Sequence, residues 1–254
     1  VVEGNKIEST SYTAGCGGIN LNPAYDGTQP GEYCRNCIVR GNTLINAAAV
    51  GIAVSGAPGI VIENNWVVQT ISSTVSTGFA HPGRNPSIGG SFDDTYDDAD
   101  SAAVFRNNGC YFGSPSDGAI CINFSGQPTG TGLRMIGNLA IFATASGTQR
   151  CWGTTTLANF TTWNWNLCFG ADEWSDDYAT HALAHAAGYD TWSTAGGLAD
   201  NDPLIAAVPS SGNGWACTLS SGSPALNVGG SGLSRLGIKS AKIVGTRDIG
   251  PCER

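Results

Sequence analysis

Charged residues are scarce in this chain, and the shortage excludes several classes of protein. Asp, Glu, Lys and Arg make up 13% of the 254 residues, and 20 acidic residues outnumber 12 basic ones. The net charge of −8 argues against a nucleic acid as partner, because binding to its phosphates requires clustered Lys and Arg. No run of 18 apolar residues occurs either, so we expect no membrane span.

Methionine is nearly absent, since Met135 is the only one in the chain. No secretory leader is visible, and the chain begins with Val1-Val2-Glu3, which already fits the repeat described below. We therefore expect the translated start to lie elsewhere. An uncovered first coil would leave an open sheet edge, so we also expect an upstream segment or a neighbouring subunit to cover it.

Glycine and asparagine are plentiful by contrast, and six asparagines share one sequence context. Each follows an apolar residue by three positions and precedes a small or apolar residue by two, and five of the six also precede an apolar residue by three. These asparagines are Asn5, Asn42, Asn65, Asn108, Asn138 and Asn166. The pattern predicts a strand, a turn at the asparagine and a second strand. It recurs at intervals of 37, 23, 43, 30 and 28 residues.

A repeat of this length with insertions is typical of solenoids, in which each coil buries its apolar face against the next. We therefore predict an all-β chain folded as a right-handed parallel β-helix. Stacked coils would align the six asparagines in a ladder, with each side-chain amide bonded to the next. Asparagine also suits the turn itself, because it tolerates the left-handed backbone conformation.

The repeat predicts one domain with two parts. Residues 1–170 are expected to form the coils, with insertions at about 11–36 and 71–103. Residues 171–254 are expected to form a short side helix near 176–188 and a segment that caps and closes the coils.

The predicted side helix has recognisable ends and two histidines. Ser175-Asp176-Asp177 can cap its start, where the acidic side chains of Asp172-Glu173 would also favour the helix dipole, and Gly188 can end it. His181 and His185 are four residues apart and share one face, so we interpret them as an exposed pair.

Charges alternate at the position two residues before the first four asparagines, which reads Glu3, Arg40, Glu63 and Arg106. In a stack these side chains would be neighbours, and opposite charges on adjacent strands attract. We therefore predict an outward charge ladder, with a substrate-binding role for the arginines as the alternative.

The nine cysteines point to an oxidising, extracellular setting, because none forms a convincing metal or redox motif. Cys121 and Cys151 each follow a ladder asparagine by 13 residues, so we predict that they form a disulfide between adjacent coils. Cys110 and Cys168 stand two coils apart, which is too far for a bond between them, and we interpret them as small core residues.

The other cysteines suggest two further disulfides. Cys217 could bond to Cys252 and hold the C-terminal segment, and Cys16 could bond to Cys34 or Cys37. The odd total leaves at least one thiol unbonded.

The C-terminal tail carries three motifs that resemble the closing segment of secreted right-handed parallel β-helix proteins of the pectate-lyase-like superfamily. The motifs are Asp202-Pro203-Leu204-Ile205, Gly222-Ser223-Pro224-Ala225-Leu226-Asn227-Val228-Gly229 and Arg247-Asp248-Ile249-Gly250-Pro251-Cys252-Glu253. Proteins of that superfamily typically end with an Asp-Pro-Leu-Phe-like step, a Gly-Ser-Pro-Ala-Ile-Asp-x-Gly turn and Asp-Ile-Gly-Ala-Tyr-Glu. In this chain Asn227 replaces the usual Asp, and Pro251-Cys252 replaces Ala-Tyr.

The resemblance implies the β-helix fold and an extracellular setting at a cell or virion surface. It implies no catalytic residue, because the tail motifs are structural. The superfamily includes polysaccharide lyases, glycosidases, phage spikes and surface adhesins, so the fold alone does not choose among these functions.

His81 and Arg84, both within the predicted insertion at 71–103, are the candidate catalytic residues. In lyase chemistry a base removes the proton next to a carboxylate, and a cation neutralises that carboxylate. Arg106 with Tyr96 or Tyr111 could fill the same roles.

The same insertion contains a candidate calcium site with five carboxylates in eight residues. They belong to Asp93, Asp94, Asp97, Asp98 and Asp100. Hard oxygen ligands at this density could hold Ca²⁺, although the spacing has no central glycine and no terminal glutamate. We therefore prefer to interpret the run as a solvated acidic loop, with the calcium site as the alternative.

Tryptophans are the candidate glycan contacts. Trp163 occupies a repeat position and is expected in the core, whereas Trp152 and Trp165 are expected at the surface, where their rings could stack on sugars.

The sequence therefore predicts an extracellular or virion-surface β-helix that acts as a rigid structural or adhesive element, with polysaccharide or neighbouring subunits as partners. The alternative is a polysaccharide lyase or glycoside hydrolase that acts on an extended glycan.

Overall fold

The computed structural model describes most of the coils and part of the C-terminal segment. The described residues are 1–11, 17–21, 34, 36–47, 49–54, 57–72, 76–81, 102–114, 118–124, 131–144, 147–153, 157–191, 202–215, 217–221, 223 and 225.

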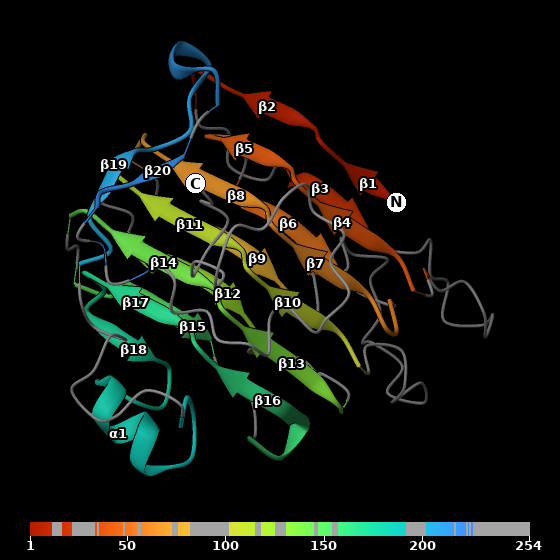
Figure 1. Cartoon of the computed structure of the whole chain (residues 1–254), viewed down its shortest axis with the longest axis vertical. Coiled ribbons are helices and arrows are strands. Elements are labelled where there is room, and N and C mark those ends of the chain that lie inside the picture. The colour runs from red at the N-terminus through yellow and green to blue at the C-terminus, as the bar shows by residue number, and fades with distance from the viewer. Residues whose placement is uncertain are drawn as a thin grey trace.

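Three parallel sheets of six strands each, here named A, B and C, form a parallel β-helix and confirm the predicted fold (Figure 1). Sheet A contains β1 (Val2–Glu3), β4 (Ile38–Arg40), β7 (Val61–Glu63), β10 (Val104–Arg106), β13 (Leu133–Ile136) and β16 (Phe160–Asn164). Sheet B contains β2 (Lys6–Glu8), β5 (Thr43–Ile45), β8 (Trp66–Gln69), β11 (Gly109–Phe112), β14 (Leu139–Phe142) and β17 (Leu167–Phe169). Sheet C contains β3 (Gly17–Leu21), β6 (Val50–Val54), β9 (Thr77–Ala80), β12 (Ile120–Asn123), β15 (Arg150–Gly153) and β18 (Glu173–Ser175).

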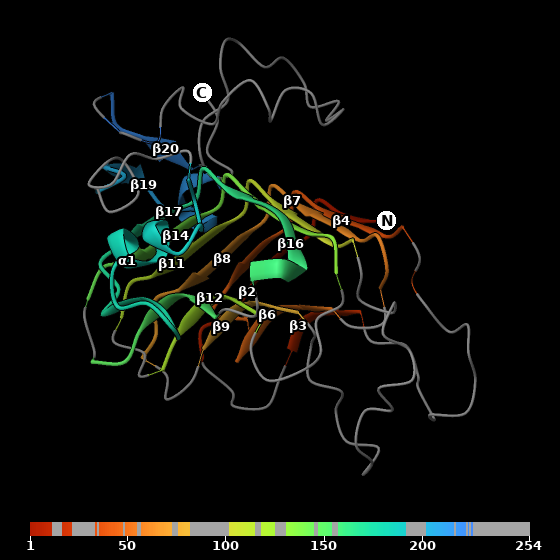
Figure 2. The same ribbon diagram turned by 90° about the horizontal axis from the view of Figure 1, so that it is seen from below.

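The chain passes through sheets A, B and C in turn, so each set of three consecutive strands makes one coil and six coils stack in order. Viewed from below, the three sheets enclose a common interior (Figure 2). The remaining elements are α1 (His181–Ala186), the antiparallel strands β19 (Ile205–Ala207) and β20 (Thr218–Leu219), and the 3₁₀ turns at Leu157–Asn159 and Ser211–Asn213.

The six asparagines form the predicted ladder at the corner between sheets A and B. In each of the first five, the side-chain Nδ2 donates to Oδ1 of the next asparagine at 2.9–3.1 Å. The backbone N–H donates to the same Oδ1 at 2.9–3.2 Å. From the second asparagine onward, Nδ2 also donates to a backbone carbonyl of the preceding coil. The bonds between asparagines therefore join all six coils and run in one direction, from an N-terminal donor to a C-terminal acceptor.

The left-handed residue of each corner is the one before the ladder asparagine, which corrects the expectation that the asparagine itself adopts this conformation. The six residues have φ between +54° and +69° and are Gly4, Gly41, Asn64, Asn107, Gly137 and Trp165. The preceding residue makes the tight bend, which leaves the ladder asparagine to extend its side chain along the stack.

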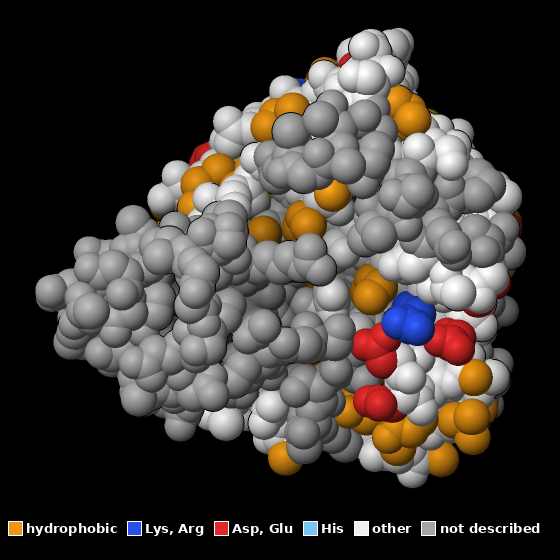
Figure 3. Space-filling view, turned by 180° about the vertical axis from the view of Figure 1, so that it is seen from behind, with side chains coloured by type: hydrophobic (Ala, Val, Ile, Leu, Met, Phe, Trp, Pro, Cys, Tyr) orange, Lys and Arg blue, Asp and Glu red, His pale blue; other side chains and the backbone are white. Residues whose placement is uncertain are grey.

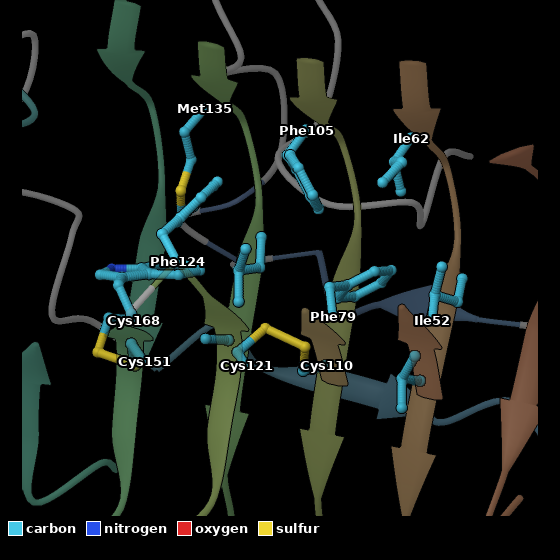
Figure 4. Close-up of a cluster of buried hydrophobic side chains, with 14 of the residues drawn as sticks. Ile52, Ile62, Phe79, Phe105, Cys110, Cys121, Phe124, Met135, Cys151 and Cys168 are labelled. Carbon is cyan, nitrogen blue, oxygen red and sulfur yellow. A yellow bond between two sulfur atoms is a disulfide. The ribbon is translucent and has the colours of Figure 1, made fainter. Parts of the chain in front are cut away.

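Inward apolar side chains from all three sheets pack in one core. The residues three positions before the asparagines, Val39, Ile62, Phe105, Met135 and Trp163, are at most 4% exposed. They pack with sheet C residues such as Ile52 and Phe79 (Figure 4).

Two sheet C strands fall inside stretches that the sequence predicted as insertions, 11–36 and 71–103. The strands β3 and β9 each combine a core residue, Ile19 or Phe79, with a glycine that faces sheet B. A Cβ on Gly78 would collide with Sγ of Cys110, and one on Gly18 would collide with Cδ2 of Leu44. Side chains of sheet B thus approach the backbone of sheet C closely at these two glycines.

A second apolar cluster lies on the outer face of sheet B. Ile45, Val68 and Ile141, each three residues after a ladder asparagine, pack with Leu219 and Ala225 of the C-terminal segment. The apolar residue three positions after the ladder asparagine therefore lies on the outer surface of sheet B that the C-terminal segment covers.

The disulfides differ from the predicted Cys121–Cys151 pair. Cys110 bonds to Cys121, and Cys151 bonds to Cys168 (Figure 4). The predicted register is correct, because the residues on either side of Cys121 lie beside those on either side of Cys151. Side chains on adjacent parallel strands point the same way, however, whereas cysteines of sheets B and C face each other across the interior. Cys110 and Cys168 are therefore bridging residues rather than simple core residues.

The other cysteine predictions are resolved in part. Cys34 bonds to Cys37, so neither is available to Cys16. Cys217 is disulfide-bonded, as predicted, but Cys16 and Cys252 lie outside the described residues, and Cys217–Cys252 stays a prediction.

The side helix is shorter than predicted and begins later. α1 starts after the N-cap Thr180, whose side chain accepts a hydrogen bond from the Leu183 N–H. Ser175 instead accepts hydrogen bonds from the N–H groups of Asp177 and Tyr178 in the preceding turn. Gly188, with φ of +101°, follows the end of the helix as predicted.

Candidate functional site

His81 follows β9 and lies inside the β-helix. Its side chain is fully buried, with its ring 5.6 Å from that of Phe105 and 5.9 Å from that of Phe124. Arg84 lies outside the described residues, so the structure does not place the predicted catalytic pair together. His81 is therefore a core residue, and a polymer that passes along the outside of the coils cannot reach its side chain.

The second suggested pair, Arg106 with Tyr111, is separated by the corner of the coil. Arg106 lies on sheet A, where its Nε donates to Oε2 of Glu63 at 2.7 Å. Tyr111 lies on sheet B and packs against the apolar cluster under the C-terminal segment. Tyr96 lies outside the described residues.

The charge ladder on sheet A consists of two ion pairs, as the alternation predicted. Arg40 bonds to Glu3 near the N-terminal end, where the two side chains are 43% and 53% exposed. Arg106 bonds to Glu63, where they are 10% and 4% exposed. The first pair is at the surface, but the second is buried and corrects the expectation of an outward ladder along its whole length.

Sheet C carries a third charged cluster, which the sequence did not reveal. Arg150 donates to Oε2 of Glu173 at 2.9 Å and to Oδ1 of Asp176 at 2.6 Å. Hydrogen bonding to Glu173 is the largest cause that raises the pKa of Arg150. Figure 3 shows a basic side chain bordered by acidic ones on this far side of the molecule.

The acidic residues before α1 therefore act on the coils rather than on the helix dipole, which corrects the sequence interpretation. Glu173 and Asp176 accept the two bonds from Arg150. Asp172 Oδ2 accepts hydrogen bonds from the backbone N–H groups of Gly147 and Gln149, both at 2.9 Å. The three carboxylates thus connect the sixth coil to the fifth.

Trp152 is a core residue, contrary to the surface position predicted for it. It is fully buried, and its ring lies 6.4 Å from that of Trp174. Trp163 is buried as predicted. Sequence reasoning failed at Trp152 because its side was assigned by alternation from Trp163, which lies on sheet A of the next coil, whereas the sheet C register places Trp152 beside the buried Ile122.

Trp165 is the half-buried tryptophan at the sheet A–B corner of the last coil. It has φ of +60° at a position that holds glycine or asparagine in the other five coils. A left-handed conformation costs a residue with a Cβ roughly 1–2 kcal/mol, and such strain concentrates at functional sites.

His181 lies between α1 and the last coil and is buried, which corrects the interpretation of an exposed pair with His185. Its Nε2 is 3.8 Å from Oδ2 of Asp190. Burial, with a smaller contribution from His185, lowers the pKa of His181 to about 4. The imidazole is therefore neutral at physiological pH and belongs to the packing of this end.

The candidate calcium ligands at Asp93, Asp94, Asp97, Asp98 and Asp100 lie outside the described residues, so their role stays a prediction. In the part of the chain that the structure describes, no three His, Cys, Asp or Glu side chains converge as a metal site. Nor does any helix in this part have the length and apolarity needed to cross a membrane.

Comparison of the chain with protein-family models, with curated proteins and with solved structures gave no match.

Proposed function

We propose that this chain is a rigid extracellular β-helix module that acts as a structural and adhesive element of a surface and binds polysaccharide along its side. The main support is the asparagine ladder, whose middle members Asn42, Asn65, Asn108 and Asn138 are completely buried. Bending the stack at any of these coils would separate buried hydrogen-bonding groups, each of which costs about 1–3 kcal/mol to leave unsatisfied. The ladder therefore favours a stiff rod.

Disulfides support an extracellular setting. Two of them, Cys110–Cys121 and Cys151–Cys168, link sheets B and C across the interior. Structural disulfides of this kind persist in oxidising compartments and are rare in the cytosol.

The C-terminal segment supports the resemblance to secreted β-helix proteins. In the Asp-Pro-Leu-Ile motif, the Asp202 carboxylate accepts a hydrogen bond from the Leu204 N–H at 2.8 Å. This turn leads into β19, and the segment then covers the apolar outer face of sheet B. This contact supports the closing role that the resemblance implies for the motif.

Trp165 supports the adhesive part of the proposal. The indole Nε1 of Trp165 is buried, so the half-buried ring offers a ligand part of its flat apolar face, a surface that favours binding interfaces. The presence of Trp165 at a positive φ, where glycine or asparagine would relieve strain, is the observation that favours a ligand at this corner.

The test is binding of the purified chain to immobilised neutral and acidic polysaccharides. We expect Trp165→Ala to abolish binding and Leu183→Ala, which truncates a 56% exposed side chain on α1, to leave it unchanged. Unchanged binding by Trp165→Ala would contradict the assignment of the site. Release of unsaturated sugars or new reducing ends would replace the proposal by the lyase or hydrolase alternative.

A further inference from the structure

Three of the four arginines that the structure describes are held by carboxylates. Arg40, Arg106 and Arg150 each have a nitrogen within 2.9 Å of a glutamate or aspartate oxygen. The fourth, Arg134, is exposed on β13, and within the described residues no carboxylate bonds to it. Because a guanidinium stays charged at every physiological pH, Arg134 presents a cation with five N–H donors to the solvent.

The neighbours of Arg134 on the same face of sheet A carry no compensating charge. Arg134 lies between Val104 of the fourth coil and Thr162 of the sixth. Two residues further along β13, Ile136 lies beside Arg106, at the position where Glu and Arg alternate in the first four coils. The charge ladder of sheet A therefore ends before β13, and Arg134 lies among apolar and neutral polar side chains.

A β-bulge lies opposite Arg134. The parallel strands β13 and β16 pair with Leu133 beside Phe160. The next pair is Arg134 beside Thr162, so Thr161 is an extra residue of β16, and its hydroxyl donates to the Leu133 carbonyl at 3.3 Å. Among the described strand pairs of sheets A, B and C, the register shifts only here. Bulges are rare between parallel strands and recur at sheet edges and next to functional sites, where they redirect a side chain.

The strained Trp165 belongs to the same pair of strands, which lie next to each other at one end of sheet A (Figure 1). It directly follows β16 and comes three positions after Thr162, the neighbour of Arg134. With about 3.3 Å per residue along a strand and about 4.8 Å between strands, the Cα atoms of Arg134 and Trp165 are roughly 11 Å apart. A short oligosaccharide spans this distance.

The chemistry of the two side chains selects the ligand. A guanidinium donates two parallel hydrogen bonds to a carboxylate, and a sulfate offers a similar pair of oxygens. The net charge of −8 repels an acidic polymer from the surface as a whole, so such a polymer requires a cation where it binds. A neutral glycan, by contrast, offers the guanidinium no charged partner.

We propose that Arg134 and Trp165 form one binding site for an acidic glycan on the outer face of β13 and β16. Arg134 pairs with a carboxylate or sulfate group, and Trp165 packs on a neighbouring sugar ring. This inference rests on the proposed function, because it names the class of polysaccharide that the site at Trp165 takes. Arg134 is the residue that determines this specificity.

Matched pairs of polymers test the selection. The intact chain is titrated with a homopolymer of glucuronic acid and with the same polymer after reduction of its carboxyl groups to alcohols. Dextran sulfate and dextran form a second pair, which distinguishes a sulfate from a carboxylate as the group bound. Arg134→Gln removes the cation, and Arg134→Lys keeps the charge but loses the paired geometry. Arg40→Gln, at the exposed ion pair with Glu3, removes an equal charge elsewhere on sheet A and is the control.

We expect the chain to bind at least one acidic polymer more tightly than its neutral counterpart, with an affinity that falls as the salt concentration rises. Arg134→Gln should weaken this binding at least about tenfold and should leave binding of the neutral polymers unchanged. Arg134→Lys should lose less, and Arg40→Gln should bind as the wild type does. Trp165→Ala should weaken binding of acidic and neutral polymers alike.

Equal affinity for the acidic and neutral members of both pairs would overturn the inference and leave the proposed function standing. Acidic binding that Arg134→Gln leaves intact would do the same. Equal weakening by Arg40→Gln would also overturn it, because the net charge of the chain rather than Arg134 would then set the affinity. If none of the four polymers binds, the proposed function fails together with this inference, so the two failures are distinguishable.

Discussion

Cys121 and Cys151 lie at adjacent positions of neighbouring strands in sheet C, yet each forms its disulfide with a cysteine of sheet B. Cys121 bonds to Cys110 of its own coil, and Cys151 bonds to Cys168 of the next coil. The two bonds fasten sheet C to sheet B over the last three coils.

Mass spectrometry of non-reduced peptides should therefore find the Cys110–Cys121 and Cys151–Cys168 links. The Cys151–Cys168 bond joins residues 17 positions apart, and closing a loop of about this length stabilises the folded chain by about 3 kcal/mol. Replacing both cysteines by Ala should therefore lower the free energy of unfolding by about 3 kcal/mol. A Cys121–Cys151 link in the peptide map would contradict this arrangement.

The two sheet A ion pairs should differ in their effect on stability. Arg106→Ala leaves the Glu63 carboxylate buried and should cost about 3–5 kcal/mol, whereas Arg40→Ala at the exposed pair should cost about 1 kcal/mol or less. Urea unfolding of both variants tests this difference. The double variant Glu63→Gln/Arg106→Met should recover much of the loss, and equal effects of the two single variants would be inconsistent with the different burial.

Gly41 tests the left-handed corner. A Cβ there would meet no atom closer than 3.9 Å, so Gly41→Ala should cost about 1 kcal/mol through backbone strain alone. Gly41→Asn should cost less, because asparagine occupies the same position at Asn64 and Asn107 with positive φ. Thermal unfolding of the two variants provides the comparison, and a larger loss in Gly41→Asn would refute the corner assignment.

Stability should fall on mild acidification because of His181. Its pKa is about 4 in the folded chain and near 6.5 when unfolded, so between these values the unfolded chain binds the proton more readily. The free energy of unfolding should decrease as pH falls from 6.5 and level off below about 4, by roughly 3 kcal/mol in total.

His181→Gln should remove this part of the pH dependence, and His185→Gln should keep most of it. Urea unfolding between pH 4 and 7 measures both. A wild-type profile that is flat over this range would show that His181 is not buried as a neutral group.

Sheets A and B could be predicted from the sequence because the asparagine fixes their register. Counting from Asn65 and Asn108 placed Glu63 beside Arg106 and Ile62 beside Phe105, as the structure has them. Sheet C could not be counted in this way, since the connection from corner to sheet C changes from coil to coil. That variation hid the bonds between Arg150 and Glu173, which lie beside each other although they follow their ladder asparagines by different numbers of residues.

The candidate sites could be predicted less well than the fold, because burial depends on contacts between distant segments. His81 follows the end of β9, and its ring packs on Phe105 and Phe124, which belong to a later coil and are distant in the sequence. The spacing of His181 and His185 on one helix face predicted that His181 is exposed. His181 is instead buried, because the turn after α1 brings Tyr189 and Asp190 back onto the last coil.

The most direct test is the change in the free energy of unfolding when a ladder asparagine in the middle of the stack is replaced. Asn108→Ala removes bonds to Asn65, to Asn138 and to the Ile62 carbonyl, all of them buried. It should lower the free energy of unfolding by about 3–5 kcal/mol in urea, whereas Asn5→Ala, at the exposed asparagine of the first coil, should lower it by less than about 1 kcal/mol. Equal, small effects of both substitutions would contradict the claim that a continuous buried ladder holds the coils together.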